Sequence, residues 1–218
     1  MVYFVDGRTA ERLGREGIRA FADLMSDAFM GHENWSHVLR DPLKRKRVLY
    51  HLFAFMGAVF DRHGHIVVAT GEDGRSVGYI TFMENRDRAQ MSFGRIVRSG
   101  TLGHGLAFLF CLGPRELAGM SAFNRAVKVF YSGYDADPSG LHLYNTGIDP
   151  ALKGKGVMKR AFAYADARLS EAGFTSYFLE TTDPANLPVY ERFGLVEFAT
   201  EPIAGSERAL HYFRKSIP

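Results

Sequence analysis

The stretch that most restricts the fold of this chain is an apolar strand followed by a glycine- and lysine-rich turn and then a helix. The predicted strand starts at Leu141 and ends at Ile148, and the turn carries Gly154 and Gly156. Apolar residues recur at helical spacing after the turn, at Met158, Phe162, Ala165 and Leu169. This spacing predicts a helix with one buried face, so that a strand, a turn and a helix follow one another as in an α/β fold.

The charges around this turn indicate an anionic ligand. Four basic residues crowd the turn and the start of the helix: Lys153, Lys155, Lys159 and Arg160. No carboxylate occurs between Asp149 and Asp166 to balance them. A helix N-terminus already carries roughly half a positive charge, so added cations destabilise it unless an anion binds nearby. Phosphate is the simplest such anion, and glycines without a Cβ allow the backbone to approach its oxygens.

The spacing excludes two common phosphate-binding motifs. The nucleotide-triphosphate loop G-x-x-x-x-G-K-[ST] is absent, because Gly147 stands seven residues before Gly154 and Lys155 is followed by Gly156 instead of a hydroxyl residue. The dinucleotide fingerprint G-x-G-x-x-G would require glycine at Lys159. The phosphate ligand therefore belongs to another class.

The segment resembles the acyl-CoA signature [RQ]-x-x-G-x-[GA] of the GNAT N-acetyltransferase superfamily. Lys153-Gly-Lys-Gly-Val-Met158 occupies the signature, and Ile148-Asp-Pro150 matches the end of the preceding strand. Lys153 replaces the usual Arg or Gln, and Met158 replaces a small residue. A Met158 side chain that pointed outward would displace a cofactor, whereas its place in the apolar stripe predicts that it faces the core.

The resemblance implies which residues bind acetyl-CoA. The main chain of Gly147 and Ile148 would hydrogen-bond the pantetheine arm, and a backbone N–H near Ile148 would stabilise the oxyanion. The pyrophosphate would lie against the turn and the start of the helix, formed by Lys153, Gly154, Lys155, Gly156, Val157 and Met158.

A second matching segment lies downstream, after a strand predicted at Thr175 to Leu179. Asn186 is followed four residues later by Tyr190, and then by a Gly194-Leu195 turn, as in GNAT enzymes. Four-residue spacing places Asn186 and Tyr190 on one face of a helix. The resemblance implies that Asn186 contacts the cofactor and that Tyr190 is the general acid for the leaving thiolate. The alternative is that Tyr190 packs against the core with its hydroxyl at the surface.

The general base is predicted less directly. Glu180 ends its strand at the mouth of the expected opening and is the first candidate, although a strand-end carboxylate also forms ordinary ion pairs. His142 alternates with Leu141 and Leu143, so its side chain lies on the opposite face of the strand from theirs. His32 and Glu33 occupy a position where related enzymes contact the acceptor, but an ordinary polar loop explains them equally well.

The first half of the chain is organised around helices. Helical periodicity covers 16–30 and 42–61, and two strands, 65–70 and 76–83, flank a hairpin turn at 71–74. A further helical region is predicted near 94–131, either as an acceptor-binding lid inserted in the fold or as packing material. The basic run 44–47 could bind nucleic acid, although a solvated helix face is the ordinary explanation of such a run.

Composition limits the remaining possibilities. A length of 218 residues with 46% hydrophobic content favours a single domain, 1–218, with a helix-rich half at 1–139 and an acyl-CoA-binding core at 140–218. A net charge of +3 is too small to indicate nucleic-acid binding. No apolar segment has the length of a membrane span, no signal peptide is evident, and no Cys or His spacing indicates a metal. The single cysteine, Cys111, is expected to be buried and is compatible with a cytoplasmic location.

We therefore expect an α/β GNAT acyl-CoA N-acyltransferase fold, with a mixed, mostly antiparallel sheet splayed near Ile148 and helices on both faces. The expected function is transfer of an acetyl group from acetyl-CoA to a primary amine. The helical first half and the phrase Leu179-Glu-Thr-Thr182 resemble the small-molecule enzymes of the family and favour a small amine. Two alternatives remain open, a non-catalytic acyl-CoA-binding regulatory module and a protein N-acetyltransferase. A homodimer could form through a strand at 208–214, which would look the same as an exposed edge strand.

Overall fold

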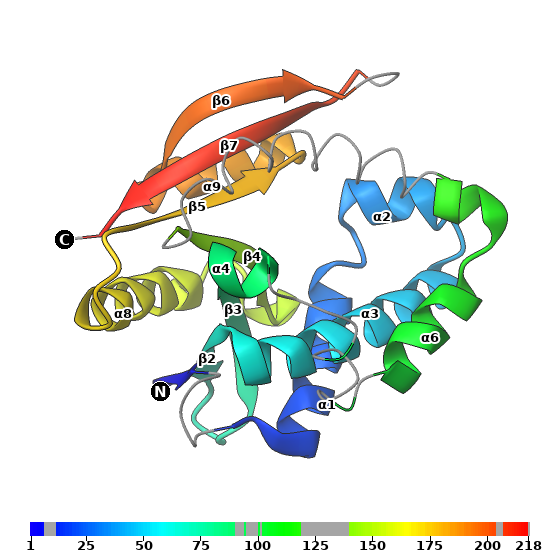
Figure 1. Ribbon diagram of the computed structural model, residues 1–218, viewed down its shortest axis with the longest axis horizontal. Coiled ribbons are helices and arrows are strands. Elements are labelled where there is room, and N and C mark those ends of the chain that lie inside the picture. The colour runs from blue at the N-terminus through cyan, green and yellow to red at the C-terminus, as the bar shows by residue number, and fades with distance from the viewer. Residues whose placement is uncertain are drawn as a thin grey trace.

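The computed structural model describes residues 1–6, 12–89, 94, 100, 102–118, 140–203 and 207–217. These residues form a twisted sheet with helices on both sides (Figure 1). The strands are β1 (Val2–Asp6), β2 (His65–Thr70), β3 (Ser76–Glu84), β4 (Leu141–Ile148), β5 (Ser176–Thr181), β6 (Val196–Pro202) and β7 (Ala209–Ser216). The helices are α1 (Gly14–Ala28), α2 (Glu33–Val38), α3 (Pro42–His63), α4 (Asn85–Ala89), α6 (Leu102–Cys111), α8 (Val157–Glu171) and α9 (Leu187–Arg192), with short 3₁₀ turns at Pro150–Leu152 and Pro184–Asn186.

The seven strands form one sheet in the order β1-β2-β3-β4-β5-β7-β6. Every neighbouring pair is antiparallel except β4 and β5, which are parallel. The prediction of a mixed, mostly antiparallel sheet is therefore confirmed. One prediction for the C-terminus is corrected: β7, which contains most of 208–214, lies between β5 and β6 and is not an edge strand. The edge at that end is β6.

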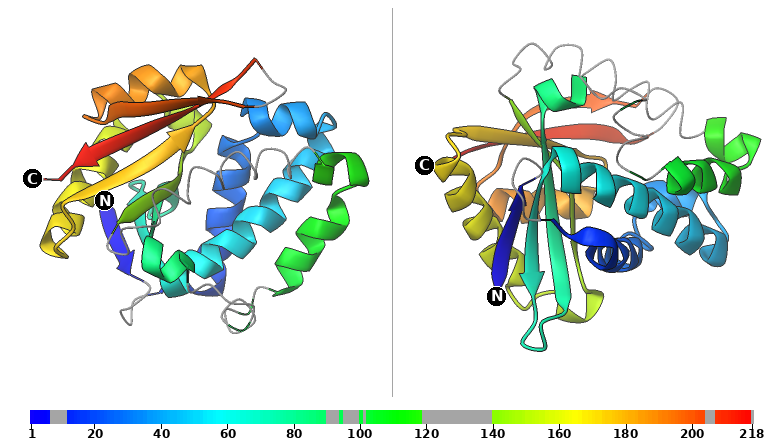
Figure 2. Two further views of the ribbon diagram at one scale, coloured as in Figure 1. Left: turned by 45° about the horizontal axis from the view of Figure 1, so that its top comes forward. Right: turned by 60° about the horizontal axis from the view of Figure 1, so that its bottom comes forward.

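Side chains of a strand alternate between the two faces of the sheet. Each face of the sheet is covered by different helices (Figure 2). Val67, Ile80 and Phe82 pack against α8. Ile66, Val68 and Tyr79 pack against α1 and α3, in a separate cluster. The expected arrangement of helices on both faces is thus confirmed.

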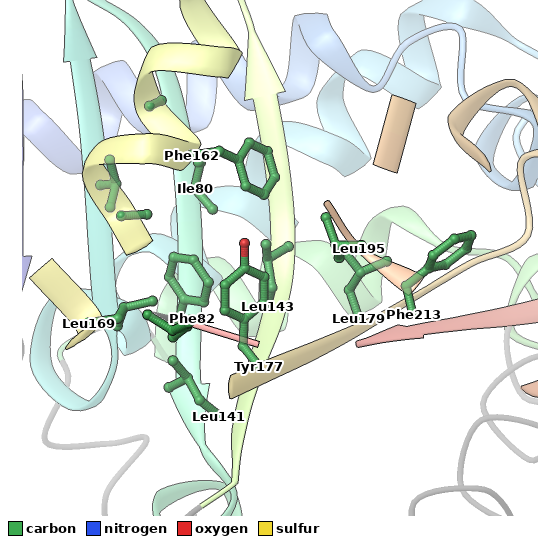
Figure 3. Packing of buried hydrophobic residues seen from close by; sticks show 14 residues of the cluster. Ile80, Phe82, Leu141, Leu143, Phe162, Leu169, Tyr177, Leu179, Leu195 and Phe213 are labelled. Carbon is green, nitrogen blue, oxygen red and sulfur yellow. The ribbon is translucent and has the colours of Figure 1, made fainter. Parts of the chain in front are cut away.

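The cluster that Val67, Ile80 and Phe82 form with α8, hereafter the α8 cluster, continues from the first strands into the C-terminal half of the sheet. Figure 3 shows Phe162 and Leu169 of α8 beside Phe82 of β3 and Tyr177 of β5. Asp166 of α8 also accepts a hydrogen bond from the Tyr177 hydroxyl at 3.2 Å and forms an ion pair with Lys215 of β7 at 2.6 Å between Nζ and Oδ2. One helix therefore connects both halves of the sheet.

Local signals in the sequence explain the bounds of α3. Asp41 caps the helix, because its Oδ1 accepts a hydrogen bond from the Leu43 N–H at 2.9 Å, and Pro42 occupies the first helical position. Close packing between α1 and α3 depends on Gly57, where an added Cβ would lie 2.7 Å from the Phe21 ring. The expected helices and the two strands of the first hairpin are present, with ends shifted by two residues or fewer.

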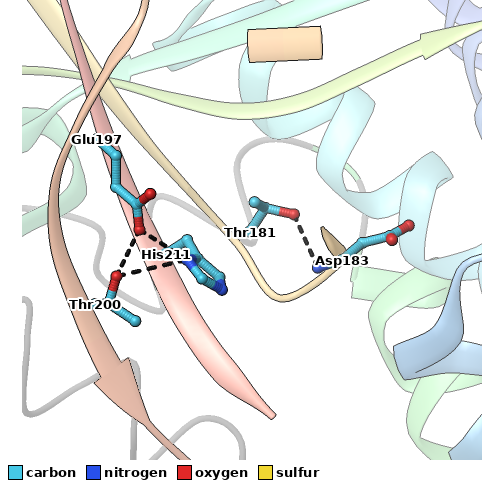
Figure 4. Close-up of polar contacts among 5 residues, drawn as sticks. All are labelled: Thr181, Asp183, Glu197, Thr200 and His211. Atoms are coloured by element: carbon cyan, nitrogen blue, oxygen red, sulfur yellow. Dashed lines mark hydrogen bonds and ion pairs between the residues drawn. The ribbon is translucent and has the colours of Figure 1, made fainter. Parts of the chain in front are cut away.

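The β6–β7 hairpin carries a polar cluster on exposed strand positions (Figure 4). Glu197 Oε1 accepts hydrogen bonds from the Thr200 hydroxyl at 2.5 Å and from His211 Nδ1 at 2.7 Å. These two contacts lower the pKa of the Glu197 carboxyl. The cluster links the edge strand β6 to β7 beside the irregular register between Glu197 and Ala199.

Within the region near 94–131, the described part contains α6 and a short helix at 114–118; the rest of that prediction lies outside the described residues. None of the residues of α6 is buried, and Phe110 is 85% exposed. Cys111 is half-buried against the cluster of Leu39, Val48 and Leu112, so the expectation that it is buried is wrong. Cys111 ends a helix that packs on α3 without burying any of its own residues, so the cysteine retains partial access to solvent.

The basic run 44–47 makes contacts within the chain. Lys44 and Lys46 form ion pairs with Glu116 and Asp27, each at 2.6 Å. Arg45 donates hydrogen bonds to the backbone carbonyl oxygens of Met30 and Leu39, both at 2.7 Å. Three of the four cations therefore brace α3 against neighbouring segments.

In the part of the chain that the structure describes, no helix combines the length and the apolar character needed to cross a membrane.

Gly147 of β4 tests the packing of α1 against the sheet. A Cβ added there would lie 2.5 Å from Met25 Sδ and 3.3 Å from Ala28 Cβ, both on α1. We expect Gly147→Ala to lower the free energy of unfolding by about 1–3 kcal/mol, because α1 would have to move away. Gly103→Ala in the first turn of α6 is the control: an added Cβ meets no atom within 4 Å, so stability should stay the same or rise slightly. Urea denaturation measures both changes, and an unchanged midpoint for Gly147→Ala would contradict the packing described.

Candidate active site

The strands β4 and β5 separate after two residue pairs. Leu141 pairs with Tyr177 and His142 pairs with Phe178, and the register ends there. From Leu143 to Ile148, β4 continues with β3 on one side, and on the side toward β5 it has no strand partner among the described residues, while β5 turns away paired with β7. The predicted splay includes Ile148 but begins five residues earlier, at Leu143.

A backbone irregularity lies within this separated part of β4. The register with β3 shifts between Thr81, which pairs with Asn145, and Phe82, which pairs with Leu143. Tyr144 is therefore an extra residue in β4, as in a β-bulge, and a bulge increases the local twist of a strand. This twist lies at the point where β4 turns away from β5.

The turn between β4 and α8 is shaped by its glycines. Asp149 Oδ1 accepts a hydrogen bond from the Ala151 N–H at 2.9 Å and begins the 3₁₀ turn. Gly154 and Gly156 adopt left-handed φ values of 82° and 73°, which glycine adopts without the steric cost of a Cβ. A Cβ at Gly154 would meet nothing within 4 Å, so backbone conformation and not crowding requires this glycine.

The start of α8 is open to an anion. Gly156 is the N-cap residue, and no side chain caps the first amide groups of the helix. Lys153, Lys155, Lys159 and Arg160 are all exposed. Within the described residues, none of these four side chains forms an ion pair. The positive end of the helix dipole and these four exposed cations therefore lie together at the turn and the first turn of α8.

Met158 is half-buried and packs against the α8 cluster. The prediction that its side chain faces the core is confirmed, and Val157 at the first helical position is half-buried as well. The side chain of Met158 therefore does not cover the first turn of α8.

The second predicted segment forms a 3₁₀ turn and the short helix α9. Asp183 Oδ1 caps the turn by accepting the Ala185 N–H at 3.0 Å. The Thr181 hydroxyl, at the end of β5, accepts hydrogen bonds from the Asp183 N–H at 3.2 Å and from Asn186 Nδ2 at 3.3 Å; the first is drawn in Figure 4. Asn186 is the N-cap of α9, so its amide is fixed to the strand end.

Tyr190 of α9 packs against the same cluster as α8, with its ring 5.6 Å from the Phe213 ring. Burial raises the pKa of the Tyr190 phenol strongly, and the negative charges of Glu180 and Asp183 raise it further. The phenol therefore remains protonated throughout the neutral and mildly basic range. A protonated phenol can donate a proton or a hydrogen bond.

Glu180 lies on the other face of β5 from Leu179, by strand alternation. Its Oε2 is 2.7 Å from His142 Nε2, and its side chain is 18% exposed. In the sequence, His142 and Glu180 are separate candidates, and the structure brings them into contact. The signal available in the sequence is the strand alternation, which puts His142 and Glu180 on the opposite faces of their strands from the neighbouring leucines.

The predicted site residues thus fall into two groups around the separated strands. Gly147 and Ile148 end β4, and the turn from Lys153 to Met158 follows it. Glu180 lies near the end of β5, and Asn186 and Tyr190 follow that strand. His32 stacks on Phe29 at 5.5 Å before α2, and the side chain of Glu33 lies outside the described residues, so an acceptor contact there stays a prediction.

This geometry can be compared with known proteins. The model of the acetyltransferase (GNAT) family matches residues 20–195, which is most of the chain. The chain belongs to the GNAT acetyltransferase family. No curated protein matches it by sequence. GNAT acetyltransferases use acetyl-CoA as the acyl donor, and the resemblance noted in the sequence is confirmed.

Solved structures share the fold at low sequence identity. An agmatine N-acetyltransferase, solved as a point mutant in its apo form, is 13% identical, with 99% of each chain covered and a TM-score of 0.58. An aminoglycoside 6'-N-acetyltransferase complexed with coenzyme A is 11% identical, with 95% of this chain and 96% of that one covered and a TM-score of 0.53. The ribosomal-protein-S18-alanine N-acetyltransferase of Escherichia coli is 11% identical, with 100% and 94% covered and a TM-score of 0.51. Identities this low show the fold alone.

The raised pKa of Tyr190 can be tested by titration. Removing the negative charge in Glu180→Gln is expected to lower the pH at which Tyr190 ionises, because a nearby anion disfavours the phenolate. Tyrosinate absorbance measures this when each protein is compared with its Tyr190→Phe derivative. Glu171→Gln is the control, since Glu171 is an exposed partner of Arg168 on α8. Ionisation of Tyr190 at the ordinary pH of a tyrosine in the unmodified protein would refute the described environment.

Proposed function

We propose that this protein is an acetyl-CoA-dependent N-acetyltransferase that acetylates a primary amine of a small molecule. The observation that carries the proposal concerns two residues beyond the divergence of β4 and β5. The raised pKa of Tyr190 keeps its phenol protonated near pH 7, and the Glu180 carboxylate is partly exposed. One group can donate a proton and the other can accept one. Acyl transfer from a thioester to an ammonium requires both.

The residues beside the separated strand fit acetyl-CoA. The unpaired side of β4 at Gly147 and Ile148 offers backbone groups to an extended pantetheine arm, as a neighbouring strand would. The uncapped start of α8, with Gly154, Gly156 and Val157 and the side chains of Lys153 and Lys155, suits a pyrophosphate. Bound there, acetyl-CoA supplies the acetyl group, whose C–S bond breaks as the N–C bond to the amine forms.

The chain's own groups complete the proton balance of this exchange. Glu180 takes one proton from the acceptor ammonium, which frees the lone pair of the nitrogen for attack. Tyr190 donates its phenolic proton to the departing sulfur and regains the second proton that the nitrogen loses. Glu180 then returns its proton to solvent, so that one proton is released in each cycle. Asn186, fixed to Thr181, holds the start of α9 against the end of β5 and so sets the position of Tyr190.

One observation supports a small acceptor: similar folds occur in the agmatine and aminoglycoside enzymes, both named for small amines. The helical first half of the chain joins the acyl-CoA half in a single sheet, which supports one functional domain over 1–218. A protein acceptor is the competing substrate class, since the S18-alanine enzyme shares the fold. A non-catalytic acyl-CoA-binding module is the competing function.

Replacement of Tyr190 separates an enzyme from a binding module. In an enzyme, Tyr190→Phe should lower kcat by about 10²–10⁴-fold while acetyl-CoA affinity stays within about threefold, because a general acid contributes to turnover and little to binding. Thiol release from acetyl-CoA with a panel of small amines and N-terminal peptides measures turnover, and calorimetry measures affinity. Tyr164→Phe, on α8 against the same cluster, is the control and should keep its activity.

Two outcomes of that experiment would contradict the proposal. Acetyl-CoA binding without thiol release for any acceptor would favour the binding module. Turnover with peptides and with none of the small amines would favour a protein acceptor.

The proposed pyrophosphate site predicts different effects for two left-handed glycines. Gly156→Ala should weaken coenzyme A binding by about tenfold or more, because the added Cβ strains the backbone at the N-cap of α8 and shifts its first amides. Gly74→Ala has a similar φ, 79°, in the β2–β3 turn and should lose similar stability with unchanged affinity. Calorimetric titration with coenzyme A measures both variants. Equal affinities would place the pyrophosphate elsewhere.

A further inference from the structure

A buried histidine lies at the last residue pair before β4 and β5 separate. His142 is 1% exposed, and it pairs across the sheet with Phe178. Its ring stacks on Phe178 at 4.7 Å with an interplanar angle of 10°, and the Tyr144 ring is 4.1 Å away. A ring enclosed in this way has little rotational freedom, so the direction of its Nε2 atom is fixed by packing.

This Nε2 atom is bonded to a carboxylate on the other side of the divergence. His142 Nε2 and Glu180 Oε2 are 2.7 Å apart. An ionised carboxylate only accepts hydrogen bonds, so the contact requires that Nε2 carries a proton. Because His142 belongs to the last β4–β5 pair and Glu180 stands two residues beyond it, the hydrogen bond extends the contact between the two strands past the end of their ladder.

We propose that His142 is a positioning residue for Glu180, whose Nε2–H holds Oε2 and keeps the carboxylate ionised and aimed at the acceptor ammonium. The inference rests on the proposed role of Glu180 as the base and extends it to a group that does not touch the substrate. A hydrogen bond to the charged form of a carboxyl favours that form, so loss of the bond makes Glu180 a poorer proton acceptor at a given pH.

A second buried histidine in the same sheet also lies near a glutamate, and this pair can be compared with His142 and Glu180. His65 Nε2 is 3.5 Å from Glu84 Oε1, and Glu84 Oε2 is bound by Arg86 at 2.8 Å. Glu84 has 5% of its side chain exposed, against 18% for Glu180. Glu84 is thus neutralised by an arginine and hidden from an acceptor, whereas Glu180 has a short bond to histidine and partial access.

The described elements packed against His142 and Glu180 contribute further side chains around this pair. Tyr144 comes from β4 itself, Tyr212 is the cross-strand partner of Glu180 on β7, and Met83 is the partner of His142 on β3. Tyr190 on α9 and Asp183 before it interact electrostatically with one another, and Glu180 acts on the same phenol. Arg214 of β7 is the cross-strand partner of Phe178 and lies on the same face as Glu180, with its guanidinium over the Phe198 ring. Phenols are neutral near pH 7, so among the described residues Asp183 and Arg214 are the neighbouring charges that a pH profile must take into account.

Two variants at position 142 separate positioning from packing. His142→Phe keeps a flat ring and removes the N–H donor, whereas His142→Gln keeps a donor at a similar reach. We expect His142→Phe to lower kcat/KM about ten- to hundredfold at pH 7, with the acid limb of the kcat/KM profile moved to higher pH and acetyl-CoA affinity unchanged. His142→Gln should recover most of the activity and the original acid limb. Asp183→Asn in the otherwise unmodified protein shows how far the charge of Asp183 moves the limb by itself.

His65→Phe is the matched control for the loss of a buried histidine. It should lower the melting temperature and leave the pH profile as in the unmodified protein. If His142→Phe behaves in the same way, losing stability or rate without a shift of the acid limb, the positioning role is overturned.

A spectroscopic measurement tests the hydrogen bond without turnover. In protein labelled with ¹⁵N-histidine, the Nε2 of His142 should carry a slowly exchanging proton at pH 7, and its resonance should move in Glu180→Gln. An unprotonated Nε2, or a resonance indifferent to that substitution, overturns the proposal even if His142→Phe does not fold. The proposed function fails separately, if the unmodified protein transfers acetyl to no amine; transfer with an unshifted His142→Phe profile rejects the positioning role alone.

Discussion

The parallel contact between β4 and β5 is the interaction on which the arrangement of this protein depends. It consists of two residue pairs, Leu141 with Tyr177 and His142 with Phe178. A parallel pair requires a long crossover, and α8 provides it on one face of the sheet. The helix packs on β1 to β3 and is tied through Asp166 to Tyr177 and Lys215, so the two halves of the sheet are held together more by α8 than by the strand ladder.

The short contact also explains why the site residues come from separate parts of the chain. The end of β4 leads into the cationic turn, and the end of β5 leads into α9. Tyr190 reaches the divergence from the α8 face, against Phe213, while Glu180 belongs to the opposite face with His142. The proposed proton donor and the proposed proton acceptor are therefore held on opposite faces of the sheet, each on a regular element, and loops contribute little to their positions.

Much of this could be predicted from the sequence because the informative signals are local. The glycine positions, the cations at the helix start and the apolar stripe of α8 depend on neighbouring residues, and Met158 faces the core as its spacing indicates. Strand order is not local: 208–214 resembles an edge strand because Arg208 and Arg214 flank a mainly apolar stretch, yet β7 is interior. The position of β7 in the sheet depends on its pairing with both β5 and β6, which its own residues do not indicate. The contact between His142 and Glu180 could not be found by the same means, because the two residues are 38 positions apart and meet through the parallel register that α8 imposes.

The prediction for Cys111 is wrong for a related reason. Its apolar neighbours on α6 indicate burial, but hydrophobicity predicts a preference for the interior and not the presence of a covering surface.

The unpaired side of β4 has a thermodynamic consequence. In the part of the chain that the structure describes, six residues of β4, 143–148, have a strand neighbour on the β3 side alone, and β5 has one on the β7 side alone after Phe178. A ligand that lies along this side acts as a substitute strand, and its binding free energy adds to the stability of the fold. A ligand present at 100 times its dissociation constant stabilises a native state by about 2.7 kcal/mol. If the acyl donor binds there as proposed, its concentration and the fraction of the chain that is folded are linked quantities.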